Sequence, residues 1–252
     1  MNQKNIIQKS FSIQAENFET DKMNFSKEEY LNFVISKMNL NFSYLGLEVA
    51  AGTCALGCSI APYVKIMTCL DLTEKMLEVG KNKNKDNMIF VKGEAENLPF
   101  LDESFDFVVS RLAFHHFVDI DKTFKEMKRV LKRHGKIILI DMITYDNETR
   151  FTMDEIEKMR DFSHIKNLTE NEILNLYKNN NVSVEYKNNT EIEVSLDSWL
   201  ELTKTSEITR KSIINLIKDD ILGGNKTGFN PYLKNNQIFF NQNWFMVLGV
   251  KL

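Results

Sequence analysis

The chain has 252 residues, 43% of them hydrophobic, which is enough to bury one sizeable core and predicts a single α/β domain. Its net charge of −3, with lysines scattered among acidic residues, excludes the basic footprint of a nucleic-acid-binding protein and gives no indication of a membrane surface. The N-terminus lacks the apolar region of a signal peptide, and no run reaches the roughly 18 apolar residues of a membrane span, so we expect a cytoplasmic protein.

Residues 1–42 show helical periodicity, and the segment from Ser26 to Glu29 is similar to a capping box that begins a second helix. Strands and helices then alternate: we expect strands near 45–49, 65–70, 88–92, 105–110 and 135–142, with helices near 55–62, 73–82 and 119–132. Such alternation predicts a mostly parallel sheet with right-handed crossovers and a ligand site at the carboxyl ends of the strands.

The stretch from Leu45 to Asp71 indicates half of a nucleotide-binding fold. A buried strand with Glu48 near its end leads into a turn of small residues, 50–52, followed by a short helix and a second strand that ends in Asp71. Such a turn lets a ligand approach bare backbone and the N–H groups of the helix, and an acid about 20 residues on can accept hydrogen bonds from ribose hydroxyls. Two glycines of the dinucleotide fingerprint are replaced, which disfavours a dinucleotide.

The pattern Glu48-x-Ala50-x-Gly52-x-Cys54 resembles motif I of the class I S-adenosylmethionine-dependent methyltransferases. Downstream, residues 90–100, 104–116 and 129–141 are similar to the successive signatures of the ubiquinone-biosynthesis (UbiE-like) branch of these enzymes. The resemblance covers about residues 40–145. It implies a Rossmann-like, seven-stranded, mostly parallel sheet with helices on both faces and an antiparallel last strand, plus an N-terminal helical lid and a helical insertion before the final strand.

The resemblance also implies where S-adenosylmethionine binds. Asp71 is expected on the ribose, although an Asp at this position could instead cap the next helix. Leu72 is expected on the adenine, and Ser110 and Arg111 near the methionine end, where Arg111 could also bind a substrate acid or pair with Glu48. The full set of predicted cofactor-binding residues is Glu48, Ala50, Ala51, Gly52, Asp71, Leu72, Met76, Gly93, Glu94, Ala95, Glu96, Ser110 and Arg111.

Two adjacent histidines, His115 and His116, are candidate catalytic bases, because a histidine can accept a proton at neutral pH; packed histidines at a helix start are the alternative. A dense polar cluster at 160–164 falls where the family's substrate-facing insertion begins. The leading helices form the expected lid, with ordinary packing on the sheet edge as the alternative. The predicted substrate-binding residues are Phe11, Gln14, Phe18, His115, Arg160 and His164.

After residue 144 the expected elements are a helical segment at 145–167, a helix from Thr169, a strand at 182–192, a helical insertion at 196–222, a loop at 227–236 and one or two strands at 237–252. We expect segments 145–167 and 196–235 to roof the acceptor site. Trp199 and Trp244 are predicted as packing anchors, with a substrate platform as the alternative. The three cysteines indicate reduced thiols, with no disulfide framework and no metal site.

We therefore expect one methyltransferase domain over 1–252, divided into the lid at 1–42, a cofactor-binding core at 43–144, and substrate-facing helices with C-terminal strands at 145–252. The predicted activity is methyl transfer from S-adenosylmethionine to a small-molecule acceptor, without nucleic-acid or membrane partners, and the sequence leaves a homodimer open. The alternatives are a protein that binds S-adenosylmethionine or S-adenosylhomocysteine without transferring a methyl group, and a nicotinamide-dependent oxidoreductase.

Overall fold

The structure is a computed structural model that describes residues 3–15, 27–83, 85–144 and 147–252. Within these residues the apolar runs form one eight-stranded sheet in the order β3-β2-β1-β4-β5-β8-β6, with β7 paired to β8 alone. The strands are β1 Leu45–Val49, β2 Ile66–Asp71, β3 Met88–Lys92, β4 Phe105–Arg111, β5 Leu131–Ile143, β6 Val182–Ser195, β7 Tyr232–Lys234 and β8 Gln237–Lys251.

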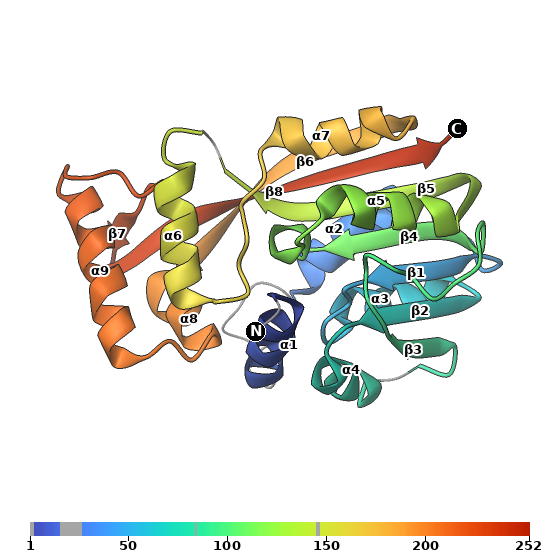
Figure 1. Cartoon of the computed structure of the whole chain (residues 1–252), viewed down its shortest axis with the longest axis horizontal. Coiled ribbons are helices and arrows are strands. Elements are labelled where there is room, and N and C mark those ends of the chain that lie inside the picture. Colours follow the sequence, from blue (N-terminus) through green and yellow to red (C-terminus); the bar gives the residue numbers. More distant parts are fainter. Residues whose placement is uncertain (1–2, 16–26, 84, 145–146) are drawn as a thin grey trace.

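The first five strands pair in parallel, and β8 runs antiparallel to both β5 and β6. The carboxyl ends of β1, β2 and β4 therefore meet at one edge of the sheet, as the alternation of strands and helices predicts (Figure 1). The crossovers carry α3 Ala55–Ile60 with η3 Ala61–Tyr63, α4 Glu74–Lys81, and η4 Phe114–His116 with α5 Ile120–Val130. A mostly parallel sheet with one long antiparallel strand inserted beside β5 is thus confirmed.

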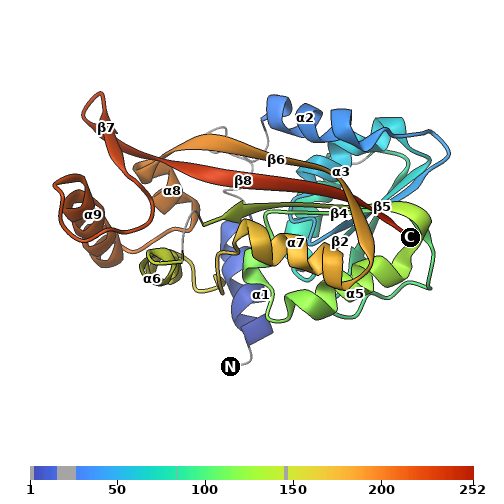
Figure 2. The same cartoon turned by 90° about the horizontal axis from the view of Figure 1, so that it is seen from above.

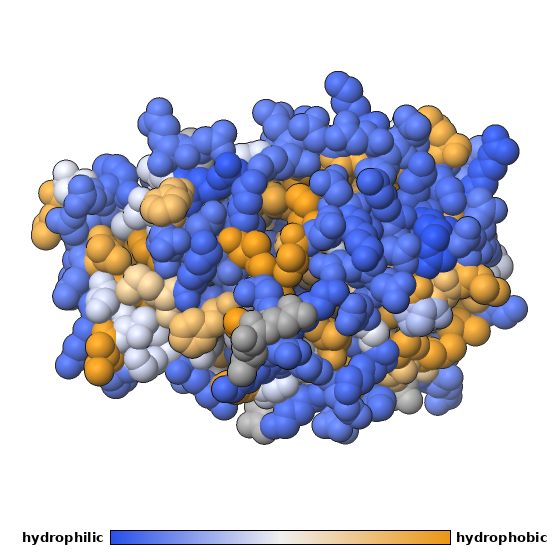
Figure 3. All heavy atoms as spheres, in the orientation of Figure 1, coloured by the Kyte–Doolittle hydropathy of each residue, from blue (hydrophilic) through white to orange (hydrophobic). Residues whose placement is uncertain are grey.

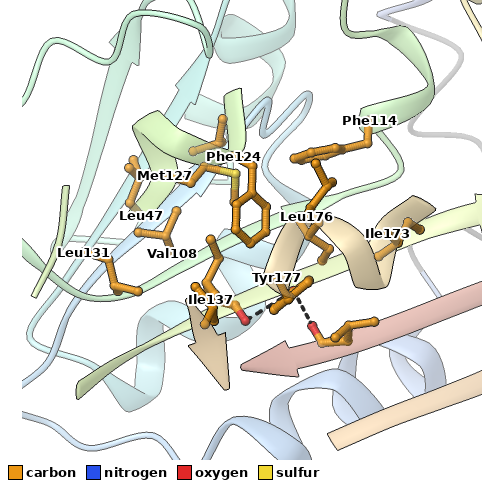
Figure 4. Packing of buried hydrophobic residues seen from close by; sticks show 14 of the residues in the cluster. Leu47, Val108, Phe114, Phe124, Met127, Leu131, Ile137, Ile173, Leu176 and Tyr177 are labelled. Carbon is orange, nitrogen blue, oxygen red and sulfur yellow. Dashed lines mark hydrogen bonds between the residues drawn. The ribbon is translucent and has the colours of Figure 1, made fainter. Parts of the chain in front are cut away.

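Helices cover both faces of the sheet because successive residues of a buried strand point to opposite sides. Leu139 packs under α5 and α7 Glu170–Asn179, whereas its neighbours Ile138 and Ile140 pack with α2 Glu28–Met38 and α3 on the opposite face. Figure 2 shows α2 and α3 on one side of the sheet and α5 and α7 on the other. Figure 4 shows the cluster beneath α5 and α7, with Phe124 and Tyr177 at its centre.

The long strands β6 and β8 run beyond the other strands into a second layer of helices, which we call the distal lobe (Figure 1). It consists of α6 Arg150–Arg160, α8 Leu196–Leu202 and α9 Glu207–Ile221, packed with the outer parts of β6 and β8. Its core includes Trp199, whose ring lies 5.4 Å from those of both Phe229 and Phe240, and Trp244 packs 5.7 Å from Tyr30. Both tryptophans are therefore packing anchors.

Some elements differ from the expectation. The loop expected at 227–236 contains β7, which adds an eighth strand, because residues 232–234 fold back on residues 237–239 of β8 across a tight turn. Strand β5 begins at Leu131, four residues early, with a register irregularity against β4. α2 begins at Glu28, and Ser26 of the expected capping box lies outside the described residues. The three cysteines are free thiols: Cys58 is half-buried and the other two are buried.

None of the helices in the described ranges is long and apolar enough to cross a membrane. The first helix, α1 Gln3–Gln14, lies across the carboxyl edge of the sheet, next to α4 and facing the distal lobe (Figure 1). The edge of the sheet, α1 and the distal lobe thus surround one region of the molecule.

The buried hydroxyl of Tyr177 joins α7 to the sheet by donating to the carbonyl of Val247 at 2.9 Å (Figure 4). Tyr177→Phe keeps the ring packing but leaves this carbonyl without its side-chain donor, so it is expected to lower the free energy of unfolding by about 0.5–1.5 kcal/mol. Urea denaturation measures the change. The half-exposed Tyr63 provides the control, Tyr63→Phe, which should leave stability unchanged. Equal effects of the two substitutions would contradict this account of Tyr177.

Candidate functional site

A large cavity opens at the carboxyl edge of the sheet, between α1 and the distal lobe. It encloses about 1460 Å³ of non-protein space, open solvent at its mouth included. In Figure 3 hydrophobic atoms gather near the middle of the molecule, between the sheet and the distal lobe. The walls of the cavity come from α1, from the loops after β1, β2, β3 and β4, and from residues of α6, α8 and β8.

One wall is the turn after β1, where Ala50, Gly52 and Cys54 all have positive φ angles between 54° and 59°. Gly52 has open space where a Cβ would stand, so its backbone conformation favours glycine there and crowding does not. Ala50 and Ala51 also line the cavity. Small side chains at this turn leave its backbone open to a ligand, as the sequence predicts.

Asp71, at the end of β2, ties two of these loops together. Its carboxylate accepts the N–H of Gly52 at 2.8 Å and the N–H of Thr73 at 2.7 Å. The N-cap of α4 is Thr73, so Asp71 does not cap the helix, although it does bond to a backbone N–H at the helix start. Burial raises the pKa of Asp71, while the hydrogen bonds from Thr73 and Gly52 oppose that change. Asp71 also lines the cavity.

Glu48 lies beneath the turn and is buried. Its Oε2 accepts the N–H of Gly57 at 2.9 Å, which fixes the first turn of α3 against β1. Burial raises the pKa of Glu48 to about 7; the negative charge of Asp71 acts in the same direction, and the positive charge of Arg111 opposes it. Near pH 7, Glu48 is therefore present in both its protonated and its ionised form.

Arg111, at the end of β4, is half-buried and forms no ion pair with a described carboxylate, although the charge of Glu48 acts on it. Its Nε and Nη1 are buried and have no hydrogen-bond partner among the described residues. It lines the large cavity and also a smaller one beside Tyr30 and Trp244. Native proteins leave few buried donors unpaired, so two on one guanidinium indicate that a ligand supplies their acceptor. The neighbouring Ser110 is buried with its hydroxyl unpaired and does not line the cavity.

Helix α1 closes the cavity from the N-terminal side. Lys4 forms ion pairs with Glu94, at 2.8 Å, and with Glu96, in the loop after β3. Gln8 donates to the carbonyl of Leu72 at 3.2 Å. Further along the helix, the ring of Phe11 stands edge-on to that of His116, with 4.9 Å between centroids. The helix therefore contacts both the loops that carry predicted cofactor residues and the histidine pair.

Three histidines lie together beyond the end of β4. His115 and His116 have ring centroids 4.0 Å apart, and His164 lies 5.8 Å from His115. The Nδ1 of His115 bonds to Asp141 at 2.5 Å, and the Nδ1 of His116 lies 3.1 Å from the hydroxyl of Ser163. His164 bonds through Nε2 to the carboxylate of Asp154 at 2.8 Å.

The distal side of the cavity is largely apolar. Met142, Leu202 and Trp199 line it, together with Arg160 and Gln242. Arg160 lies over the Trp199 ring at 4.3 Å and pairs with the buried Glu157 at 2.9 Å, so it is held in place from two sides. The indole N–H of Trp199 has no partner.

The structure brings most of the predicted site residues to this one cavity. Exceptions are Ser110, behind the wall, and His164, which lies behind the other two histidines and bonds to Asp154; Phe18 lies outside the described residues. Lys4, Met142 and Gln242 also line the cavity, although the sequence does not predict them there. No local motif marks them, because distant elements place them at the cavity. No cluster of three or more candidate metal ligands occurs in the described ranges.

Comparisons with known proteins identify the family. The methyltransferase domain family matches residues 47–139. The methyltransferase YcgJ of Bacillus subtilis, itself uncharacterized, is 30% identical over 212 residues, which are 81% of this chain and 82% of YcgJ. Its crystal structure superposes with a TM-score of 0.78 at 28% identity, covering 88% of this chain and 98% of YcgJ.

Two further proteins extend the comparison. A crystal structure from Bacillus halodurans, assigned as a methyltransferase, shares the fold with a TM-score of 0.81 at 24% identity, and covers 88% of this chain and 99% of its own. The demethylmenaquinone methyltransferase of Thermotoga maritima is 40% identical over 92 residues, which are 36% of this chain and 39% of that enzyme. The predicted resemblance, including its UbiE-like branch, is thus confirmed over the core.

The raised pKa of Glu48 predicts a specific pH dependence of stability. Since the folded-state pKa of about 7 exceeds the ordinary value of 4.5, the native state binds the extra proton, and this stabilisation is lost as pH rises from about 4.5 to about 7. Relative to Glu48→Gln, the wild type should lose roughly 3 kcal/mol over this range, at about 1.36 kcal/mol per pKa unit.

Urea denaturation at several pH values measures this difference. The exposed Glu78 on α4 provides the control, Glu78→Gln, which should track the wild type at every pH. A constant difference between wild type and Glu48→Gln from pH 4.5 to 8 would show that Glu48 titrates normally.

Proposed function

The chain belongs to the class I S-adenosylmethionine-dependent methyltransferases, and we propose that it methylates a small molecule inside the cavity between α1 and the distal lobe. S-adenosylmethionine supplies the methyl group, which is carried on a positively charged sulfonium. The proposal rests on the cavity itself. Residues of the sequence motifs, from the loops after β1, β2, β3 and β4, line one side of it, and the distal wall opposite is largely apolar.

The lining of the cavity changes from one half to the other. The motif residues line its proximal half, and Met142, Trp199 and Leu202 line its distal half. This division supports a cofactor site beside an apolar acceptor site. A walled cavity also favours a small molecule over a macromolecule.

In the proximal half, the place of Asp71 in the cavity wall supports its proposed role on the ribose hydroxyls of the cofactor. The open backbone at 50–52 would lie along the methionine part, and Leu72 with Glu94–Glu96 would surround the adenine. The α1 contacts from Lys4 and Gln8 to these same loops would close the site over the cofactor. Ser110 and Met76 would support the site from behind and beside it.

Arg111 is the proposed partner of the cofactor carboxylate. Its two unpaired donors sit in the cavity wall, and a guanidinium binds a carboxylate through paired hydrogen bonds. A carboxylate at this place would also compensate a buried charge that the protein itself leaves unpaired.

These residues promote methyl transfer by alignment and by exclusion of water. The reaction is an in-line displacement, so holding both reactants in register removes most of its entropic barrier. The positive charge of the sulfonium disappears in the transfer, and a dry, apolar distal wall favours that loss. Incubation with S-adenosylmethionine and a metabolite library tests the activity: S-adenosylhomocysteine should accumulate with particular small molecules only, and failure of the protein to bind either cofactor form would contradict the proposal.

Asp71→Ala should lower the affinity for S-adenosylhomocysteine by about 1.5–3 kcal/mol, because a charge-assisted hydrogen bond to the ribose is lost. Isothermal titration calorimetry measures the affinity. The exposed Asp86 gives the control, Asp86→Ala, which should bind as the wild type does. Unchanged affinity of Asp71→Ala would remove Asp71 from the cofactor site.

The role of Arg111 is tested with two ligands that differ in the amino-acid part. Arg111→Met should weaken binding of S-adenosylhomocysteine by about tenfold or more, since a charged hydrogen-bonded pair is lost. It should leave 5′-methylthioadenosine, which has no carboxylate, bound as before. Arg133→Met, at an exposed arginine, is the control. Equal loss for both ligands, or loss for neither, would contradict the assignment.

A further inference from the structure

A buried carboxylate that the motifs do not include, Asp161, is the centre of a hydrogen-bond network behind the histidine pair. Its Oδ1 accepts the hydroxyl of Ser163 at 2.5 Å, the N–H of Ser163 at 2.9 Å and the hydroxyl of Ser10 at 2.8 Å. Its Oδ2 accepts the amide of Gln14 at 3.0 Å. Burial would raise the pKa of Asp161, but the charge of Arg160 and the hydrogen bonds from Ser163 and Gln14 hold it below its usual range. Asp161 is therefore ionised.

The network determines which nitrogen of His116 carries a proton. The hydroxyl of Ser163 has a single hydrogen, and that hydrogen is donated to Asp161. Toward the Nδ1 of His116, 3.1 Å away, the Ser163 oxygen can only accept. The neutral ring must then carry its hydrogen on Nδ1 and a lone pair on Nε2. Nε2 has no hydrogen-bond partner among the described residues, and the ring lines the cavity.

The surroundings of the two neighbouring histidines shift their pKa values in opposite directions. Burial lowers the pKa of His115, but the carboxylate of Asp141 outweighs this and raises it overall. Burial and the nearby His115 lower the pKa of His116 well below its ordinary value, and His164 adds to this, whereas Asp161 and Ser163 oppose it. Groups with pKa values pushed apart in this way take different roles. The Nδ1 of His115 is bonded to Asp141, and the lowered pKa of His116 favours its neutral ring, which is the form that can accept a proton.

We propose that Asp161 and Ser163 are positioning residues that hold His116 with its Nε2 lone pair toward the cavity, where it accepts the proton of a hydroxyl group as that oxygen is methylated. This inference rests on the proposed function and names the acceptor class as a hydroxyl compound. The acceptor oxygen forms its bond to the methyl carbon while the carbon–sulfur bond breaks and its electron pair stays on sulfur. The hydroxyl proton passes to Nε2, so the products are the methyl ether, S-adenosylhomocysteine and the imidazolium of His116.

The charge balance of the cavity suits an acceptor such as a hydroxyl, which loses a proton as it is methylated. The sulfonium loses its positive charge in the same step in which His116 gains one, so the net charge of the enclosed site is unchanged. Asp161, through Ser163, then stabilises the imidazolium. A base with a low pKa cannot take a proton from an alkylammonium ion beforehand, but a hydroxyl becomes strongly acidic as its oxygen is methylated.

Helix α1 contributes to the same hydrogen-bond network. Ser10 and Gln14 supply two of the hydrogen bonds to Asp161, while Lys4 and Gln8, on the same helix, contact the loops of the proposed cofactor site. Closure of α1 over the cofactor therefore also completes the network that orients His116. The base would be fully assembled only when the lid is closed.

The deciding experiment is nitrogen-15 NMR of the histidine rings in the full chain saturated with S-adenosylhomocysteine, because ring shifts distinguish the two neutral tautomers from the imidazolium. His116→Gln assigns the His116 signals by their disappearance. At pH 7 the wild type should show a neutral His116 with hydrogen on Nδ1 alone. A His116 with hydrogen on Nε2, or a charged one, would overturn the proposal without any acceptor being known.

Ser163→Ala and Asp161→Asn test the positioning role. Each should convert the single Nδ1–H form of His116 into a mixture of tautomers. Ser163→Ala, which leaves the bonds from α1 to Asp161 in place, should also keep the wild-type affinity for S-adenosylhomocysteine, whereas failure of the proposed function would show as loss of that affinity in the wild type. Ser212→Ala, at an exposed serine of α9, is the control and should leave the spectrum as it is. If both variants fold and keep the wild-type tautomer, Ser163 and Asp161 do not position the ring.

A milder variant guards against misfolding. Ser10→Ala removes one bond to Asp161 from α1 and leaves the buried Ser163 in place. Ser10→Ala should broaden or shift the His116 signals in the same direction as Ser163→Ala and Asp161→Asn do. Unchanged signals would contradict the role assigned to α1.

With a hydroxyl acceptor, His116→Gln should lower kcat by about a hundredfold or more at unchanged affinity for the methyl donor.

Discussion

The carboxylate of Asp71 is the interaction on which the proximal half of the cavity depends. By accepting the N–H groups of Gly52 and Thr73, it ties the turn after β1 to the start of α4. Parallel strands bring these two loops to one edge, but only such a cross-link fixes their spacing. The carboxylate is buried by the same loops that it joins, and this burial raises its pKa.

Electrostatic balance links the two halves of the cavity. Glu48 and Asp71 stand on one side of Arg111, while Asp161 and Asp141 stand behind the histidines. Each of these carboxylates accepts hydrogen bonds from backbone or side-chain donors, whereas Arg111 has two buried donors without a partner among the described residues. A cationic methyl donor with a carboxylate of its own suits such a site: the carboxylate would meet Arg111, and the positive charge would be passed to His116 as it is lost from sulfur.

The sequence predicted the core closely because strand and motif coincide there. β1 and β3 have the expected bounds, and the acids at strand ends lie at the cavity as the spacing indicates. The sequence does not predict the short strand β7, because three residues paired across a turn are too few to show the alternating pattern of a strand. The polar cluster at 160–164 was noticed, but its division into a network at Asp161 and a separate pair at His164 depends on side-chain directions that only the folded chain fixes. Lys4 was missed for the same reason.

We expect S-adenosylmethionine to bind at the carboxyl edge of the sheet with α1 closed over it. Hydrogen–deuterium exchange with and without saturating S-adenosylhomocysteine tests it most directly, because bound ligand and lid closure both slow amide exchange. Protection should appear together in residues 50–55, 71–77 and 93–97 and in α1. Binding without protection of these segments, or protection confined to the distal lobe, would contradict the account.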